Sequence, residues 1–183
     1  MKRYVLTGAP GAGKTSVLRA LAERGFAVVE EAATEVIGRE QRRGVAEPWR
    51  HAGFIDLITE LQRRRLREPV AGGARVQVHD RSPLCTVALA RHLGYPVTPL
   101  LADEVARVIG EQVFDDPVFV LCPLGFIEPT AARRISYAES VEFGALHERV
   151  YAEHGFAIVH IAAGTAASRA ATIADLIAAR PPG

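Results

Sequence analysis

The sequence predicts a single α/β domain in which a parallel sheet of five strands carries helices on both faces. Short apolar runs alternate with longer segments whose apolar residues recur at helical spacing. A glycine-rich loop joins the first apolar run to the first of these segments. No repeat, low-complexity tract or linker divides the chain, so we expect one domain over residues 1–183. Strands that alternate with helices imply βαβ units, and therefore a parallel sheet between layers of helices.

Each expected element has its own signal. The strands are short apolar runs, and we place them at residues 4–6, 26–29, 75–79, 118–121 and 157–161. The helices carry apolar stripes, and we place them at residues 14–24, 32–43, 49–68, 84–92, 101–109, 136–154 and 166–179. Gly25 ends the first helix, and Gly72 and Gly73 separate the third helix from the third strand.

Composition excludes several classes of function. The formal net charge is +1, so no bulk field draws the chain to nucleic acid or to a membrane. No stretch approaches the roughly 20 apolar residues of a membrane-spanning helix, and the first residues do not form a signal peptide. Cys85 and Cys122 lack the spacing of a zinc site or a disulfide framework. We therefore expect a cytoplasmic protein without a nucleic-acid or membrane partner.

The glycine-rich loop at residues 8–15, GAPGAGKT, fits the pattern GxxxxGK[ST] after a strand and at the start of a helix. Glycines let the backbone turn its N–H groups toward phosphate oxygens, and the helix adds its positive dipole end. The lysine reaches the β- and γ-phosphates, and the threonine hydroxyl ligates Mg²⁺. The loop thus predicts ATP and Mg²⁺ as cofactors, with nucleotide contacts from Gly8, Ala9, Pro10, Gly11, Ala12, Gly13, Lys14, Thr15 and Ser16.

A carboxylate that supports Mg²⁺ is expected at the end of a strand beside this loop. The strand at residues 118–121 ends in Cys122 and offers no acid. The strand at residues 75–79 ends in Asp80, which we assign to Mg²⁺, held through water. The alternative is that Asp80 is only a helix N-terminal acid before Pro83.

The second strand ends in Glu30 and Glu31, at the edge of the sheet where doubly wound folds bind ligands. A carboxylate near the γ-phosphate can take a proton from a substrate hydroxyl. Alternatively, both acids only cap the following helix, whose dipole favours them there. We prefer Glu31 as the catalytic residue.

Arg133 and Arg134 lie in residues 125–135, which show neither strand nor helix pattern. Phosphoryl transfer needs cations around the transferred group, and a lid arginine would supply one and exclude water. The alternative is a solvated surface pair. The position between the fourth strand and a helix favours a functional role for the pair.

The remaining titratable side chains show no site pattern. The run from Arg63 to Arg65 lies on an expected helix and is typical of a solvated face. The histidines lack metal-ligand spacing, and we interpret all six as structural or surface residues: His51, His79, His92, His147, His154 and His160.

The order of these features resembles a known family. The chain carries, in sequence, GAPGAGKTS, FAVVEEAATEVI, VHDRS, VFVLCPL and RRISYAES, and then a last strand, a small-residue loop and a helix. Over residues 3–177 this order is similar to the small AAA-like P-loop ATPase and kinase family. That family includes the nicotinamide-riboside kinase domain of the bacterial NAD regulator and the TRPL translocation defect protein. The resemblance implies a nucleoside-kinase-like P-loop NTPase fold with the strand order 2-3-1-4-5.

The resemblance also implies roles by position. Glu31 matches the acid after strand two, and Asp80 with Arg81 matches the DR pair after strand three. Arg134 matches the lid arginine. The family thereby implies that Arg81 and Arg134 are catalytic residues.

Other positions match or depart from the family. The loop with Ala163 and Gly164 lies where adenine would sit. Residues 128–130 are Glu-Pro-Thr where an aspartate is common, and Thr34 replaces a common arginine. Both departures concern the acceptor half of the site.

Two functions fit these residues. The first is a kinase that moves the γ-phosphate of ATP to a hydroxyl of a nucleoside, nucleotide or similar small metabolite. The second is an ATP-dependent switch that hydrolyses slowly and signals to a protein or lipid. We favour the enzyme, whose partners are a nucleotide and a small-molecule acceptor, and the acceptor and oligomeric state stay open. We expect the acceptor pocket around Glu35, Trp49, Phe54 and Arg81, with charge balance from Lys14, Arg81 and Arg134.

Overall fold

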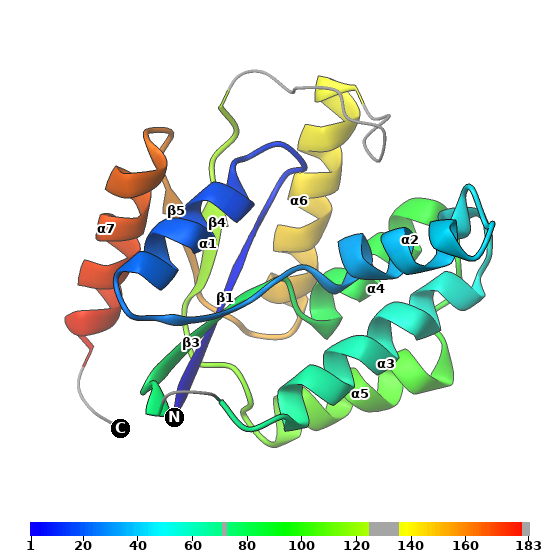
Figure 1. Cartoon of the computed structure of the whole chain (residues 1–183), viewed down its shortest axis with the longest axis horizontal. Coiled ribbons are helices and arrows are strands. Elements are labelled where there is room, and N and C mark those ends of the chain that lie inside the picture. Colours follow the sequence, from blue (N-terminus) through cyan, green and yellow to red (C-terminus); the bar gives the residue numbers. More distant parts are fainter. Residues whose placement is uncertain (71–72, 125–135, 181–183) are drawn as a thin grey trace.

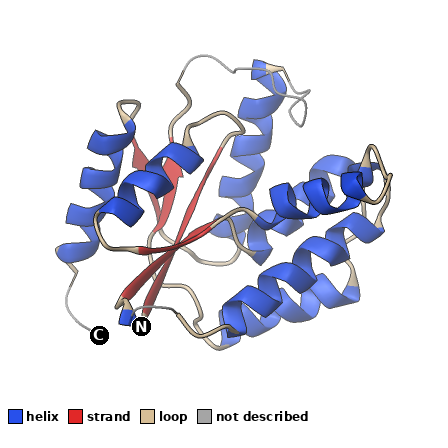
Figure 2. Cartoon of the chain, viewed as in Figure 1, coloured by secondary structure: helices blue, strands red, loops and turns tan. Residues whose placement is uncertain are grey.

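A parallel sheet of five strands, in the order β2-β3-β1-β4-β5, forms the centre of the computed structural model. The structure describes residues 1–70, 73–124 and 136–180. The strands are β1 (Lys2–Gly8), β2 (Ala27–Val29), β3 (Val76–Asp80), β4 (Val118–Leu121) and β5 (Ile158–Ile161). Figure 2 shows that helices enclose these strands. The helices are α1 (Lys14–Glu23), α2 (Ala32–Arg42), α3 (Gly53–Arg67), α4 (Pro83–Leu93), α5 (Pro99–Gly110), α6 (Tyr137–Glu153) and α7 (Ala166–Ala178), with a 3₁₀ turn, η1 (Pro48–Arg50).

The two faces of the sheet bury separate apolar clusters. Along β1, Tyr4 and Leu6 pack with residues of α1 and α7, whereas Val5 packs with residues of α4, α5 and α6. This alternation follows from the two-residue period of a strand. Figure 1 shows α1 and α7 on one side of the sheet and the remaining helices on the other.

A third apolar cluster joins α2 to α3 beside the sheet. Val36 of α2 and Phe54, Ile58 and Leu61 of α3 are buried in it. These two helices form an arm, the α2–α3 arm, which follows β2 and precedes β3 in the chain. The arm begins at the carboxyl end of β2, the end of the parallel sheet at which β1 leads into the glycine-rich phosphate loop of residues 8–15 (Figure 1). The arm supplies one wall of the cavity described below.

The fold class, the number of strands and the strand order are as predicted. The expected helix at residues 49–68 is wrong in one respect, because η1 and α3 are separate elements. His51 between them is extended, with φ −114° and ψ 129°, which ends the 3₁₀ turn before α3 begins. Among the described residues, the helices are too short or too polar to cross a membrane.

Candidate active site

The phosphate loop between β1 and α1 holds its glycines in conformations that other residues rarely adopt. Gly8, Gly11 and Gly13 have φ values of 131°, 85° and 83°. A Cβ atom at Gly8 would lie 2.7 Å from the carbonyl oxygen of Leu121, so β4 leaves no room for a side chain. Gly13 is the N-cap residue of α1, which directs the free N–H groups of the first helical turn to the loop.

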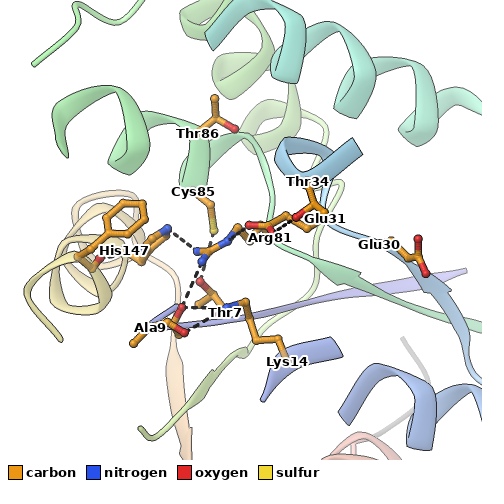
Figure 3. Close-up of polar contacts among 12 residues, drawn as sticks. Thr7, Ala9, Lys14, Glu30, Glu31, Thr34, Arg81, Cys85, Thr86 and His147 are labelled. Carbon is orange, nitrogen blue, oxygen red and sulfur yellow. Dashed lines mark hydrogen bonds and ion pairs between the residues drawn. The ribbon is translucent and has the colours of Figure 1, made fainter. Parts of the chain in front are cut away.

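Lys14 begins α1, and its side chain folds back over the loop. The side chain is buried, and Nζ donates to the carbonyl oxygens of Gly8 at 3.3 Å and Ala9 at 3.2 Å (Figure 3). Burial, and then the charge of Arg81, lower the pKa of Lys14 to about 8. A phosphate beside Nζ would replace these long contacts with an ion pair and raise that pKa again.

Arg81 stands at the turn from β3 to α4, where its φ of 73° is unusual for a residue other than glycine. Its Nε donates to Glu31 Oε1 at 2.6 Å, and its Nη2 donates to the carbonyl oxygen of Gly8 at 3.4 Å. The guanidinium carbon lies 5.7 Å from the centre of the Phe143 ring. Arg81 therefore connects the end of β2, the phosphate loop and α6.

Glu31 faces this arginine, whereas Glu30 points away from it (Figure 3). Glu31 stands at the N-cap position of α2, yet its side chain makes no capping hydrogen bond. Its second oxygen accepts from the Thr34 hydroxyl at 2.7 Å. Burial raises the pKa of Glu31, but the charges of Arg81 and Lys14 and two hydrogen bonds outweigh it and lower the pKa to about 2.

Asp80 ends β3, beside Leu6 of β1 in the sheet. The side chain is buried, and its Oδ1 has no hydrogen-bond partner among the described residues. Burial raises the pKa of Asp80 to about 6, although the charge of Lys14 opposes the shift. Asp80 therefore places an acceptor oxygen, which has no hydrogen-bond donor in the described part of the chain, close to the phosphate loop.

A cavity of about 670 Å³ lies next to these residues. The phosphate loop and the start of α1 contribute Pro10, Lys14 and Thr15 to its lining, and Glu31 and Arg81 contribute from the ends of β2 and β3. The rest of its wall comes from the α2–α3 arm, α4 and α6. Its apolar side chains are those of Ala32, Ala33, Ile37, Trp49, Phe54, Ile58, Leu89, Leu93 and Phe143, and its polar and charged ones are those of Thr34, Glu47, Arg50, Gln62, Cys85, Thr86, His92 and His147. This wall combines aromatic and aliphatic side chains with polar groups, as small-molecule sites do.

A family described as AAA domain matches residues 3–169. The chain belongs to this family. The match covers most of the chain and confirms the resemblance to small AAA-like P-loop proteins. Among curated proteins, none matches this AAA domain.

Solved structures share the fold at low sequence identity. Deoxyadenosine kinase from M. mycoides, with products dCMP and a flexible dCDP bound, has a TM-score of 0.63 at 13% identity, over 97% of this chain and 100% of that one. NadR protein in complex with NR has a TM-score of 0.67 at 18% identity, over 100% of this chain and 53% of that one. Shikimate kinase from Acinetobacter baumannii, in complex with shikimate, has a TM-score of 0.52 at 21% identity, over 97% of this chain and 93% of that one. The shared architecture is that of a P-loop NTPase.

His147 of α6 lines the cavity of this AAA domain, which the sequence did not indicate. Its Nε2 lies 2.5 Å from Arg81 Nη1 (Figure 3). The prediction that all six histidines are structural or surface residues did not single out His147, or His92, which also lines the cavity. No motif or spacing marks either residue, because only the packing of α4 and α6 brings them to the site.

Two further contacts that the sequence did not indicate hold the phosphate loop from outside. Ser140 Oγ of α6 donates to the carbonyl oxygen of Pro10 at 2.8 Å. Arg169 of α7 is buried and donates to the carbonyl oxygens of Ala12 and Cys122, both at 2.7 Å. The bonds to Pro10 and Ala12 use carbonyl groups of the loop and engage none of its N–H groups, while the bond to Cys122 ties Arg169 to the end of β4.

The expected acceptor pocket is placed correctly except for one charged residue. The cavity is lined by Trp49, Phe54 and Arg81, as expected. Glu35 does not line it, because its carboxylate accepts from Arg65 instead. Arg65 also donates to the carbonyl oxygen of Glu30 at 2.6 Å, so the solvated-face interpretation of residues 63–65 is wrong for Arg65.

The other predicted site residues are placed as follows. Arg133 and Arg134 lie outside the described residues. Ala163 and Gly164 are exposed in the loop after β5, at the same end of the parallel sheet as the phosphate loop. Within residues 1–70, 73–124 and 136–180, no group of three or more histidine, cysteine, aspartate or glutamate residues could hold a metal ion.

Proposed function

We propose that this AAA domain is an ATP-dependent phosphotransferase that moves the γ-phosphate of ATP to a hydroxyl of a nucleoside-like or nucleotide-like small metabolite. The cavity of about 670 Å³ beside the phosphate loop is the observation that carries the proposal. Small-molecule sites measure about 300–1,000 Å³, whereas hydrolysis alone needs room for only a water molecule. Glu31 and Arg81 stand where the cavity meets the loop.

The nucleotide half of the site follows from the loop. Residues 8–16 bind the phosphates through backbone N–H groups and Lys14. Ala163 and Gly164, at the same end of the sheet, take the adenine. Arg134, which lies outside the described residues, is assigned as a further cation for the transfer. These assignments are part of the proposal, as is the use of ATP.

Mg²⁺ fits the residues that are present. This ion keeps several waters and binds through one or two protein groups together with phosphate oxygens, so it needs no cluster of acids. Thr15 is exposed at the cavity and offers its hydroxyl as a direct ligand, and the unpartnered Oδ1 of Asp80 suits an ion-bound water. When bound, Mg²⁺ neutralises charge on the β- and γ-phosphates.

The acceptor hydroxyl attacks the γ-phosphorus while the bond from that phosphorus to the β–γ bridging oxygen breaks, and ADP leaves with that oxygen. Lys14 and Arg81 balance the negative charge. With a pKa of about 2, Glu31 is a weak base. We therefore assign it to accept the hydroxyl's hydrogen bond and to take the proton late, as a loose transition state allows. The proton then passes to solvent.

The neighbours in solved structures support this class of reaction. Deoxyadenosine kinase and shikimate kinase transfer phosphate by name, and NadR binds NR. This chain covers 53% of the NadR chain, so the activity of that whole protein is not carried over.

The test measures transfer from ATP–Mg²⁺ to a panel of nucleosides, nucleotides and other hydroxylated metabolites. We expect a phosphorylated organic product with at least one acceptor. Glu31→Gln should lower kcat by about 100-fold or more with ATP affinity retained. Glu30→Gln is the matched control, because Glu30 is exposed and points away from the site, and it should behave as the unmodified protein (Figure 3).

Three results would count against the proposal. ATP hydrolysis without any organic phosphate product would favour the switch. Equal kcat in the Glu31→Gln and Glu30→Gln proteins would remove Glu31 from the reaction. Undiminished ATP affinity in Lys14→Ala would contradict nucleotide binding by the loop.

A further inference from the structure

We propose that His147 is a positioning residue that holds the Arg81 guanidinium in its working orientation, an inference that rests on the proposed phosphotransfer. His147 comes from α6, and Arg81 comes from the turn after β3. Figure 3 shows the guanidinium between the imidazole on one side and Glu31 on the other.

The hydrogen-bond geometry permits one tautomer of His147. Its Nδ1 lies 2.7 Å from the carbonyl oxygen of Phe143, and a carbonyl can only accept, so Nδ1 carries the hydrogen. Its Nε2 lies 2.5 Å from Arg81 Nη1, and a guanidinium can only donate, so Nε2 carries the lone pair. Burial and the charge of Arg81 lower the pKa of His147, which keeps the ring neutral. Both neighbours therefore require the same state of the ring.

The contact with His147 opposes a competing arrangement of Arg81. A guanidinium next to a carboxylate tends to form a bidentate pair. Here Nε alone donates to Glu31 Oε1, and Thr34 occupies the other oxygen. A bidentate pair through both terminal nitrogens would need Nη1, and the hydrogen bond from Nη1 to His147 keeps that nitrogen turned away from Glu31. Nη2 is consequently held toward the phosphate loop, where the carbonyl oxygen of Gly8 lies 3.4 Å away.

The same face of α6 fixes the imidazole relative to the phosphate loop. Ser140, one helical turn before Gly144, donates to the carbonyl oxygen of Pro10. Gly144 packs so closely on Ala9 that an added Cβ would lie 3.3 Å from the Ala9 side chain. His147 follows at the next turn of this face. One rigid helix thus sets the distance between the loop that holds ATP and the arginine that faces the cavity.

The test compares His147→Leu, His147→Gln and His154→Leu. The glutamine variant supplies an amide oxygen near the position of Nε2, so it can still accept from Arg81. His154 is the matched control, because its Nδ1 also bonds the carbonyl four residues earlier, Val150 O at 2.8 Å, and its side chain is half-buried. In His147→Leu we expect kcat to fall about 10- to 100-fold, with KM for ATP and the melting temperature close to those of His154→Leu. His147→Gln should recover most of the lost kcat.

A kcat in His147→Leu equal to that in His154→Leu would overturn the inference and leave the proposed function standing. So would a glutamine variant that is folded and as slow as the leucine variant. If the unmodified protein transfers no phosphate to any acceptor, the proposed function fails, and ¹⁵N NMR then tests the placement directly. We expect an unprotonated Nε2 on His147 and a slowly exchanging Nε–H on Arg81 that exchanges faster in His147→Leu. A protonated Nε2, or an Arg81 exchange rate that does not change, would overturn the inference.

Discussion

Replacing Gly144 with alanine measures how closely α6 must approach the phosphate loop. The added Cβ would lie 3.3 Å from the Ala9 Cβ and 3.4 Å from its Cα and N. Two of these three atoms belong to the loop backbone, so no side-chain rotation can relieve the contact. Either α6 or the loop must move by a few tenths of an ångström.

Two opposing effects set the size of the change. Alanine in place of glycine inside a helix stabilises it by about 1 kcal/mol, whereas overpacking a tight contact costs about 1–3 kcal/mol. Gly110→Ala is the matched control, since a Cβ added at Gly110 of α5 meets no described atom within 4 Å. We expect Gly144→Ala to have a free energy of unfolding about 1–3 kcal/mol below that of Gly110→Ala. If the loop takes up the strain, ATP affinity falls by up to about tenfold, which corresponds to 1.4 kcal/mol.

Urea unfolding gives the two free energies, and calorimetric titration gives the dissociation constants for ATP. Weaker ATP binding in Gly144→Ala than in Gly110→Ala would show that α6 supports the loop. Equal stability and equal ATP affinity in the two variants would refute the tight packing of α6 on the loop.

Three further predictions concern charged residues around the phosphate loop. Arg169→Met removes the hydrogen-bond donor to the carbonyl groups of Ala12 and Cys122. The free energy of unfolding in urea should fall by about 2–4 kcal/mol, and ATP binding should weaken. An unchanged free energy of unfolding would contradict this prediction. The pKa of Asp80 is raised from 3.8 to about 6, so without nucleotide the protein should lose up to about 3 kcal/mol as pH rises from 4 to 6. Asp80→Asn should abolish this loss of stability between pH 4 and pH 6, and it should also slow phosphate transfer. A variant that still loses stability over this range would show that another group titrates. The pKa of Glu31 is lowered from 4.5 to about 2. Ionised Glu31 should therefore contribute roughly 1–3 kcal/mol to the free energy of unfolding above pH 4.5, and this contribution should be lost as pH falls toward 2. Glu31→Gln should flatten that acid limb of the unfolding profile, and an unaltered limb would refute the ion pair with Arg81 as its source.

The fold was predictable because its signals are local. Each strand is a short apolar run, and residues 8–15 place one strand before a helix and a phosphate-binding turn between them. The order of the strands came from the family resemblance instead. The prediction failed at residues 49–68, where Trp49 of η1 packs against the same apolar cluster as Phe54 of α3, although His51 breaks the helix between them. The spacing of apolar residues indicates which side chains are buried, but it does not reveal a break between two elements that pack against the same cluster.

The site was predictable where it lies at strand ends. The carboxyl ends of parallel strands meet at one edge, which explains why Glu31 after β2 and Arg81 after β3 are in contact at 2.6 Å. His147 and Arg169 lie in helices far along the chain, and the way those helices pack on the loop leaves no spacing signal. Glu35 was wrongly assigned to the pocket because its partner, Arg65, comes from a different helix.

The fate of the γ-phosphate tests the central proposal most directly. The protein is incubated with Mg²⁺ and ATP labelled at the γ-phosphate, together with the panel of nucleosides and nucleotides, and the label is divided between organic products and inorganic phosphate. We predict that an acceptor takes up the label, and that Lys14→Ala and Glu31→Gln both strongly reduce the rate of this uptake. Label found only in inorganic phosphate, at a rate that no acceptor alters, would contradict the assignment of the cavity as an acceptor site.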